Sequence, residues 1–499
     1  MSEPARVTLP SGLVVQRILV GLWQLADQER DGRSVDLDAA AEALAGYGRA
    51  GFDAWDMADH YGSAEIVAGR AARILEAEGR PAPTILTKWC PEPGPMTAAV
   101  VRAGVERALE RLGRDRVDVM QFHWWRYDHP AWLEAMEHLA RLREEGLVGH
   151  LGLTNFDAAH TRLLLSHGIP IATNQTCFSL VDRRAAGRMA EVARETGVRV
   201  LAFGTLLGGF LSERFLGTAE PADVADWSKM KYGRFIAAAG GWQRFQGLLS
   251  VLARIAGKHG VRIASVATRW VLDHPHVAGA IVGVRLGERE HRAASLETLA
   301  LALDADDRAA IDAAAAALAP IPGDCGDEYR KPPFLTASGD LSHHLDAVAP
   351  AFAAEPMPAR PERTRVSTGS IWEEKAGFSR AVRVGERILV SGTTATSLAG
   401  TPVAPGDVEA QATYVLDKIA ASLAPLGAGL DDVVRTRIYV ADPDDWEAVS
   451  RAHARAFGAT RPANTLVGAR LVGPYKVEIE AEAVAPPGEA TTAVRSSRT

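Results

Sequence analysis

Short apolar runs alternate with amphipathic helical patterns through the first two-thirds of the chain. The runs are apolar at nearly every position, which is typical of parallel strands covered on both faces. They lie at residues 18–21, 52–56, 84–88, 117–123, 149–153, 171–175, 199–203 and 279–283. Helical spacing occupies the segments between them, for example 39–49, 98–112, 132–143 and 185–196. Eight strands in alternation with helices over about 300 residues predict an α/β fold of the (β/α)8, or TIM-barrel, type.

A doubly wound open sheet is the alternative fold for this pattern. No GxGxxG follows the first strand, so the usual dinucleotide signature of that fold is missing. A short hairpin is expected before the barrel, around the Pro-Ser-Gly of residues 10–12. Between strands seven and eight, an insertion at 212–247 carries Trp227, Tyr232, Phe235 and Trp242. Long insertions at this end of barrel strands commonly build substrate pockets.

The pattern changes after residue 320, and a second domain is expected. Residues 347–364 are rich in alanine and proline, which is typical of a semi-rigid spacer. Beyond them, strands at 381–391, 433–440, 465–471 and 476–484 and helices at 409–423 and 444–457 predict a small α+β sheet, with helices on one face and a hairpin at the end. We therefore divide the chain into a barrel with its C-terminal loop (1–346), a spacer (347–364), a second domain (365–485) and a disordered tail (486–499).

Charge and composition exclude several classes of function. A net charge of −7 and a pI near 6.1 argue against a nucleic-acid partner, which would need a basic face. There is no apolar run of about 18 residues for a membrane span, and the N-terminus lacks a signal pattern, so a cytoplasmic protein is expected. Cys90, Cys177 and Cys325 are far apart and form no metal-spaced pair, so no metal site is expected.

Four residues with complementary chemistry follow consecutive predicted strands. Asp56 ends the second strand, Tyr61 lies five residues later, Lys88 ends the third strand and His123 ends the fourth. In a closed barrel the carboxyl ends of the strands meet at one face, so these side chains can come together. Each alone is commonly a loop or core residue; the four in this order are more specific.

This set suits the reduction of a carbonyl group. A ketone or aldehyde that receives hydride needs a positioned proton donor. Tyrosine has a pKa near 10, and we expect Lys88 to lower it, with Asp56 holding the lysine charged. A neutral nitrogen of His123 can orient the carbonyl oxygen and share its developing charge.

The segments GLWQ, DMADHYGSAE, LTKW, QFH, GLTNF and NQ resemble, in order and spacing, the signature segments of the aldo-keto reductases. The resemblance covers residues 14 to about 318 and implies that Asp56, Tyr61, Lys88 and His123 form the catalytic tetrad, with Tyr61 as the general acid/base. It also implies a set of cofactor-binding residues around the nicotinamide: Gly21, Trp23, Thr154, Asn155, Gln175, Phe203 and Leu206. Thr154 stands where serine is usual and Phe203 where tyrosine is usual; Phe203 keeps the π-face that stacking requires.

The adenosine end departs further from the family pattern. Gly283 replaces a common lysine in the loop that holds a 2′-phosphate, while Arg285 and Arg289 remain as phosphate ligands. The resemblance therefore implies NADP as cofactor, with NAD as the alternative. The alternative reading of these arginines is that they only mark the start of a helix. His60, Tyr329 and Phe334 are further candidates for the substrate mouth.

In the second domain, VSGTTAT, DVVRTRIYVAD and TRPANTLVGARLVGPYKVEIEAEAV resemble the Rid family of reactive intermediate deaminases (YjgF/RidA-like) over about 367–485. This implies a chorismate-mutase-like fold, a homotrimer, and an imine-hydrolysing site with Arg461 gripping a carboxylate and Glu478 activating water. Phe378 stands where tyrosine is usual, and Pro462 follows the arginine where a small or hydroxyl residue is common. Both changes favour a binding or trimerising role over deamination.

Three hypotheses for the whole chain follow. The first is a bifunctional enzyme, in which the Rid-like domain hydrolyses or binds an imine or enamine and the barrel interconverts a small-molecule carbonyl and its alcohol. The second is a single-activity reductase whose Rid-like domain only assembles trimers or binds a ligand. The third is a non-catalytic protein that senses the cofactor, against which the intact tetrad argues.

Overall fold

The computed structural model describes residues 5–29, 32–222, 224, 226–288, 291–330 and 349–486. Its first part is a closed barrel of eight parallel strands in the order β10-β3-β4-β5-β6-β7-β8-β9, so the predicted fold class is confirmed. The strands are β3 (Ile18–Gly21), β4 (Ala54–Asp56), β5 (Thr84–Trp89), β6 (Val117–Phe122), β7 (Val148–Thr154), β8 (Ile171–Cys177), β9 (Arg199–Phe203) and β10 (Val277–Gly283). The predicted hairpin, β1 (Arg6–Thr8) with β2 (Val14–Gln16), precedes them.

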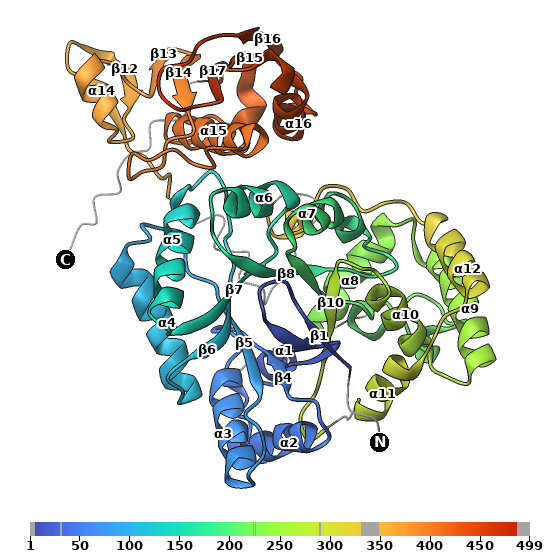
Figure 1. The fold of residues 1–499 in the computed structure, drawn as a ribbon. Helices are drawn as coiled ribbons and strands as arrows, with labels where there is room; N and C mark the ends of the chain where they lie inside the picture. Colours follow the sequence, from blue (N-terminus) through green and yellow to red (C-terminus); the bar gives the residue numbers. More distant parts are fainter. Residues whose placement is uncertain are drawn as a thin grey trace, which may run out of the picture.

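Helices surround this barrel (Figure 1). They are α1 (Trp23–Gln28), α2 (Leu37–Arg49), α3 (Ala64–Ala77), α4 (Ala98–Leu112), α5 (Ala131–Glu144), α6 (Ala158–Ser166), α7 (Arg188–Thr196), α8 (Trp227–Ala238), α9 (Trp242–His259), α10 (Ile263–Leu272), α11 (Arg292–Ala300) and α12 (Ala305–Ala316). Local sequence sets their ends: Thr97 accepts a hydrogen bond from the Val100 amide at the start of α4, and Gly113 ends that helix in the left-handed region.

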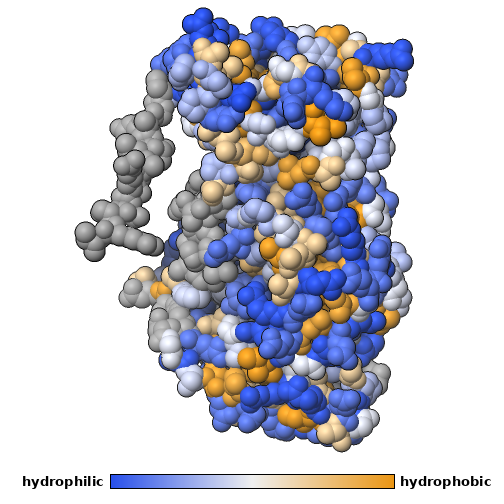
Figure 2. Space-filling view, turned by 90° about the vertical axis from the view of Figure 1, so that its left-hand side faces the viewer, coloured by the Kyte–Doolittle hydropathy of each residue, from blue (hydrophilic) through white to orange (hydrophobic). Residues whose placement is uncertain are grey.

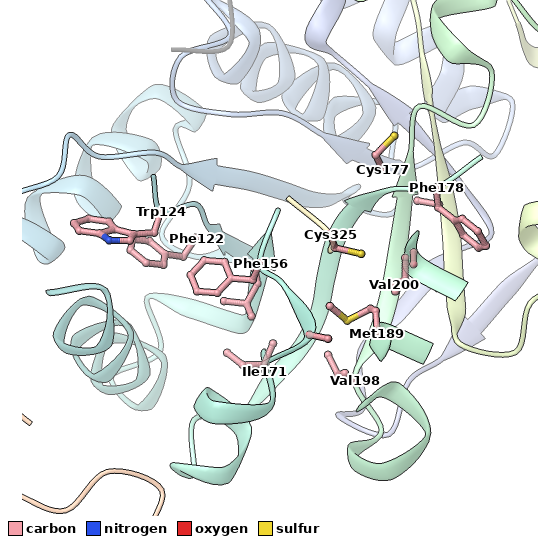
Figure 3. Packing of buried hydrophobic residues seen from close by; sticks show 14 of the residues in the cluster. Phe122, Trp124, Phe156, Ile171, Cys177, Phe178, Met189, Val198, Val200 and Cys325 are labelled. Atoms are coloured by element: carbon pink, nitrogen blue, oxygen red, sulfur yellow. The ribbon is translucent and has the colours of Figure 1, made fainter. Parts of the chain in front are cut away.

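Two apolar layers stabilise the barrel. Inside it, side chains from most strands meet those of the N-terminal hairpin, so the interior is a packed core. Between strands and helices lies a larger layer, in which Phe122 lies 5.8 Å from Trp124 and 6.1 Å from Phe156 between ring centres (Figure 3). Closure of the barrel at β10 and β3 needs glycine, because a Cβ on Gly279 would meet the Gln16 carbonyl oxygen at 2.8 Å.

The second domain is a seven-stranded sheet in the order β11-β12-β13-β14-β17-β15-β16. Its strands are β11 (Ala354–Met357), β12 (Arg360–Val366), β13 (Ala381–Val384), β14 (Arg387–Thr394), β15 (Val433–Val440), β16 (Ala463–Gly468) and β17 (Val477–Val484), and its helices are α14 (Ile371–Ala376), α15 (Val408–Leu423) and α16 (Trp446–Phe457). Strands β15 and β16 are parallel, and the other neighbours are antiparallel.

Three expectations for this domain need correction. The spacer predicted over 347–364 is wrong from residue 354 onward, because β11 and most of β12 lie there; Pro356 is tolerated since β11 is an edge strand. The single strand predicted over 381–391 is a hairpin that turns at Gly385, whose φ is +60°. The hairpin predicted at the end is also wrong, because β17 inserts between β14 and β15 and does not pair with β16.

The second domain docks on the barrel through α15, which packs against α6 (Figure 1). Trp132 of α5 meets Tyr414 of α15 edge to face, with ring centres 6.3 Å apart. Arg162 of α6 donates to Asp407 at 2.6 Å, and Asp407 also accepts the Ala410 amide at the start of α15. Figure 2 shows apolar residues dispersed among hydrophilic ones over the face that it presents. Within the described ranges, no helix is both long and apolar enough to cross a membrane.

Candidate active site

A cavity of about 540 Å³ opens at the carboxyl ends of the barrel strands. It is lined by nearly all of the residues predicted for catalysis and cofactor binding in the barrel: Gly21, Trp23, Asp56, Tyr61, Lys88, His123, Thr154, Asn155, Gln175, Phe203, Leu206, Gly283 and Arg285. Arg289 and Phe334 lie outside the described residues. The parallel register brings the set together, because Asp56 is the last residue of β4, Lys88 is the penultimate residue of β5, and His123 directly follows β6.

A buried ion pair forms the floor of this cavity. The Lys88 Nζ lies 2.7 Å from Asp56 Oδ2 and also donates to the Met57 carbonyl at 2.8 Å. Both side chains are about 4% exposed, which makes the pair costly unless it is fully hydrogen-bonded. Asp56 Oδ1 meets that requirement by accepting from Gln121 at 3.0 Å and from Gln175 at 2.6 Å. The sequence reading missed Gln121, although it lies in the QFH segment.

Tyr61 lies in a turn after β4, beside this ion pair. The Lys88 Nζ is 4.8 Å from the centre of its ring. Burial raises the pKa of Tyr61 well above its usual value, and the charge of Asp56 acts in the same direction. The net direction is opposite to the lowering that we expected from Lys88, because burial has the largest effect on the phenol. A neutral phenol is the form that a proton donor requires.

Glu29, at the end of α1, holds the turn that presents Tyr61. Its carboxylate accepts from the Ser63 amide at 2.9 Å and from the Ser63 hydroxyl. A side chain at Gly62, whose φ is +53°, would collide with this carboxylate. No spacing rule points to Glu29, since its partners come from another βα unit of the barrel.

His123 is buried and neutral. Burial lowers its pKa well below the usual value, with the charge of Arg330 adding to the effect. Its Nδ1 lies 3.2 Å from the Thr154 carbonyl oxygen, which can only accept. The proton of the ring is therefore on Nδ1, and Nε2 is an acceptor with no partner among the described residues.

Amide and hydroxyl groups gather at the ends of β7 and β8. The amide hydrogens of Gln175 are used by Asp56 and by Gln121 Oε1 at 2.8 Å. Asn155, which has a φ of +58°, presents a buried Oδ1 that accepts no hydrogen bond from the described residues. Phe203 lines the same region at the end of β9. These groups fit a planar carboxamide, whose NH2 would satisfy the unpaired Asn155 oxygen.

At the opposite end of the cavity, Arg285 is already paired. It donates to Asp27 of α1, lies 3.5 Å from Asp226 at the start of α8, and is 3.9 Å from Glu288. The loop after β10 is thereby tied across the cavity to α1 and to the insertion. A phosphate bound here by Arg285 would have to displace these carboxylates.

Only two of the four aromatic residues that we singled out in the insertion line the cavity. Trp227 and Tyr232 line the cavity, together with His60 and Tyr329. Phe235 and Trp242 do not; Trp242, the first residue of α9, packs on Phe210, Phe215 and Phe245. The split follows position along the chain: the first half of α8 lines the cavity, while Phe235 farther along α8 and Trp242 of α9 belong to the apolar layer around the barrel. Lys231 of α8, which the sequence reading passed over, also faces the cavity.

The three cysteines are free thiols. Two groups of potential metal ligands lie near them: Asp59, His60 and Cys90, and Cys177, Asp182 and Glu328. In both groups, side chains already pair with other side chains of the protein. His60 Nδ1 lies 3.0 Å from Asp59, and Arg184 pairs with Asp182 and Glu328 at 2.7 Å each.

A model of the Aldo/keto reductase family matches residues 17–316, more than half of the chain. The chain belongs to the aldo/keto reductase family. Flagellar radial spoke protein 5 of Chlamydomonas reinhardtii is 30% identical over 43% of this chain and 49% of its own length. Protein tas of Escherichia coli is 28% identical over 43% of this chain and 66% of its own length. The chain thus spans only half to two-thirds of the length of these curated relatives.

The second domain of this aldo/keto reductase belongs to another family. A model described as Endoribonuclease L-PSP matches residues 370–485, and a RutC family protein of Pyrococcus abyssi is 32% identical over 22% of this chain and 84% of that relative. A Mycobacterium tuberculosis structure of the YjgF/YER057c/UK114 family is 44% identical over 25% of this chain and 99% of that chain, with a TM-score of 0.23. A thermostable aldo-keto reductase structure is 20% identical over 62% of this chain and 99% of that chain, with a TM-score of 0.48.

No hydrogen bond or ion pair within the described part of the chain joins the two residues predicted to act in the second domain. Arg461 is exposed, in the left-handed region with a φ of +48°. Glu478 of β17 lies against Gly392 of β14, where a Cβ would collide with its carboxylate, and burial raises its pKa. Phe378 contacts the buried Arg380, whose guanidinium carbon is 5.3 Å from the ring centre.

Proposed function

We propose that the barrel is an NAD(P)H-dependent oxidoreductase that reduces an aldehyde or ketone to an alcohol, or catalyses the reverse. One observation carries the proposal. A neutral phenol, a neutral imidazole and a buried lysine–carboxylate pair share one cavity, with the Lys88 ammonium 4.8 Å from the Tyr61 ring centre. The phenol can give a proton to a carbonyl oxygen that acquires alkoxide character, and the lysine can stabilise the phenolate that remains.

Each residue has a separate task in this proposal. Tyr61 holds the proton for the carbonyl oxygen, and its neutrality keeps that proton available. Lys88, held by Asp56, stabilises negative charge on the phenol oxygen once the proton has left. His123 Nε2 accepts a hydrogen bond, so it orients the hydroxyl of the alcohol and not the free carbonyl oxygen. This role differs from our expectation from the sequence, in which His123 shares the negative charge that develops on the carbonyl oxygen.

A bound nicotinamide cofactor would supply the hydride. Thr154, Asn155 and Gln175 would hold its carboxamide, and Phe203 would offer a ring for stacking. The unpaired Oδ1 of Asn155 supports this fit. For NADP, our first choice of cofactor, Arg285 would have to exchange Asp27 for a phosphate. Comparing turnover with NADPH and NADH tests that choice.

The decisive experiment follows NADPH or NADH oxidation with a panel of aldehydes, ketones and sugars. We expect Tyr61→Phe to lower kcat by about 10²- to 10⁴-fold, the usual contribution of general acid catalysis, without weakening cofactor binding measured by fluorescence. Tyr414→Phe, which removes a buried hydroxyl at the domain interface, is the matched control. Cofactor binding without turnover on any carbonyl would favour a cofactor-sensing protein instead.

For the second domain we propose a ligand-binding or trimerising role ahead of imine hydrolysis. The absence of a hydroxyl at Phe378 and the presence of Pro462 directly after Arg461 support this order. Leu389 and Val467 are more than 40% exposed on the open face of the sheet, which suits an interface between copies. We expect the full-length protein to form trimers, as measured by light scattering. Truncation after residue 347 should abolish the trimers and leave the turnover per barrel unchanged.

Imine hydrolysis remains the second candidate, because Glu478 is half-buried with a raised pKa, as a general base needs to be. Its test is ammonia release from 2-iminopropionate. Release that Arg461→Ala abolishes and Tyr61→Phe leaves intact would establish two independent sites in a bifunctional enzyme. No release from any imine would leave the binding and assembly role.

A further inference from the structure

Lys231 extends from α8 into the cavity and is surrounded by aromatic rings. Its Nζ lies 4.5 Å from the ring centre of Tyr329, 4.9 Å from that of Phe203 and 5.6 Å from that of Tyr232. It also donates a hydrogen bond of 2.6 Å to the Tyr329 hydroxyl. The side chain is only partly exposed, so water solvates this ammonium incompletely. The aromatic rings and the Tyr329 hydroxyl fix its position.

Among the described residues, no carboxylate pairs with the ammonium of Lys231. The other cations that line the cavity mostly have carboxylates: Lys88 has Asp56, Lys229 has Asp226 at 3.2 Å, and Arg285 has Asp27. No carboxylate in the described part of the chain lies within ion-pair distance of Lys231. Arg214, at the rim, also lacks one, but it is exposed and meets water. A partly buried cation with only a neutral partner favours an anion in the cavity.

The position of Lys231 links this anion to the reacting group. The Tyr329 ring stands edge to face with His123, with ring centres 5.6 Å apart. One phenol ring therefore separates the ammonium from the imidazole. An anionic group bound by Lys231 and a carbonyl group beside Tyr61 would be parts of one small molecule.

We propose that Lys231 binds a carboxylate of the substrate, so the barrel acts on aldehydes or ketones that also carry a carboxylate group. This inference rests on the proposed reductase function and adds its substrate class. Tyr329 positions the ammonium, and Phe203 and Tyr232 flank the space beside it. A charge-assisted hydrogen bond in this partly dehydrated place would distinguish an oxo acid from its uncharged ester.

The test compares oxo acids with their methyl esters. Reduction of 2-, 4- and 5-oxo acids and the matched esters is followed for the full-length protein, for Lys231→Met and for Lys231→Arg. We expect at least one acid to be preferred, and Lys231→Met to lower kcat/KM for that acid by about ten- to a hundredfold while changing the ester less than twofold. Lys231→Arg retains the charge and most of the preference. Lys375→Met, an exposed lysine of the second domain, is the control.

A binding measurement keeps this test separate from that of the reductase function. Benzoate and benzamide are titrated against the unsubstituted protein, with the fluorescence of Trp23 and Trp227 in the cavity as the signal. Tighter binding of benzoate that Lys231→Met abolishes supports the proposal even if no carbonyl is reduced. Equal binding of benzoate and benzamide would overturn the proposal. If Lys231→Met lowers acid and ester turnover equally and also weakens cofactor binding, the proposal is likewise overturned and Lys231 is assigned to the cofactor.

Discussion

The interface between the two domains contains a histidine that forms two hydrogen bonds. Its replacement should lower the protection of the interface helices against hydrogen exchange. His160 of α6 is fully buried and stacks on Tyr127 with ring centres 3.3 Å apart. Its Nδ1 lies 2.7 Å from Asp157, and its Nε2 lies 2.8 Å from Asp417 of α15. Carboxylates only accept, so both nitrogens donate and the ring is an imidazolium. Burial alone would lower the pKa of His160, but the charges of Asp157 and Asp417 raise it.

The substitution His160→Phe removes both bonds and keeps the aromatic stack. Asp157 retains the backbone amide of position 160 and Arg455 at 3.4 Å. Asp417 loses its hydrogen-bond partner in the described structure, while its side chain is only 12% exposed. Leaving one member of a buried pair unpaired costs about 3–5 kcal/mol. Replacing Asp417 as well, by leucine, removes the orphaned charge and should recover most of that cost.

Hydrogen exchange of the α6 and α15 amides is the appropriate assay, because a two-domain chain has no single free energy of unfolding. We expect protection in α15 to fall by about 10²-fold or more in the single variant, and by less than about tenfold in the double variant. If both variants lose equal protection, or the single variant loses less than tenfold, the imidazolium bridge does not hold the domains together.

The pH dependence of the same experiment has a defined sign. A histidine whose folded-state pKa is raised contributes its full stabilisation below its unfolded pKa of about 6.5. That contribution is lost as the pH rises through the folded-state value. The difference in protection between the parent protein and His160→Phe should therefore shrink on the alkaline side and persist at pH 6. A difference that grows with pH would refute the assignment of charge.

Three further predictions concern other parts of the molecule. Glu29→Ala should lower kcat about tenfold through loss of two hydrogen bonds to Ser63, with cofactor binding unchanged; equal loss of binding would mean a wider disturbance. Arg285→Ala should raise the KM for NADPH more than that for NADH if Arg285 meets the 2′-phosphate, and steady-state kinetics with both cofactors would decide this. Burial lowers the pKa of Lys418 to about 7, and its Nζ donates to the Thr396 carbonyl at 2.9 Å. Since the unfolded lysine binds its proton more tightly, stability rises with pH above 7, and Lys418→Met should raise the melting temperature of the second domain most at pH 6; a larger gain at pH 9 would contradict this.

The barrel could be predicted because its information is local. Each strand is a short apolar run and each helix has its own period, so β3 and β9 were predicted with the bounds observed. The parallel order then brings Asp56, Lys88 and His123 to one face without further knowledge. The second domain was harder, because the place of β17 between β14 and β15 depends on pairing across the whole sheet.

The amino-acid sequence by itself determined the alternation of strands and helices, the ends of many helices, and the residue types that converge on the cavity. Only the tertiary structure decided the protonation of those residues, because burial and neighbouring charges act through space: Tyr61 is neutral despite Lys88, and Arg285 is paired with Asp27. It also decided the partners of Lys231, Glu29 and His160. Their contacts join segments far apart in the chain, and such contacts leave no periodic trace in the sequence.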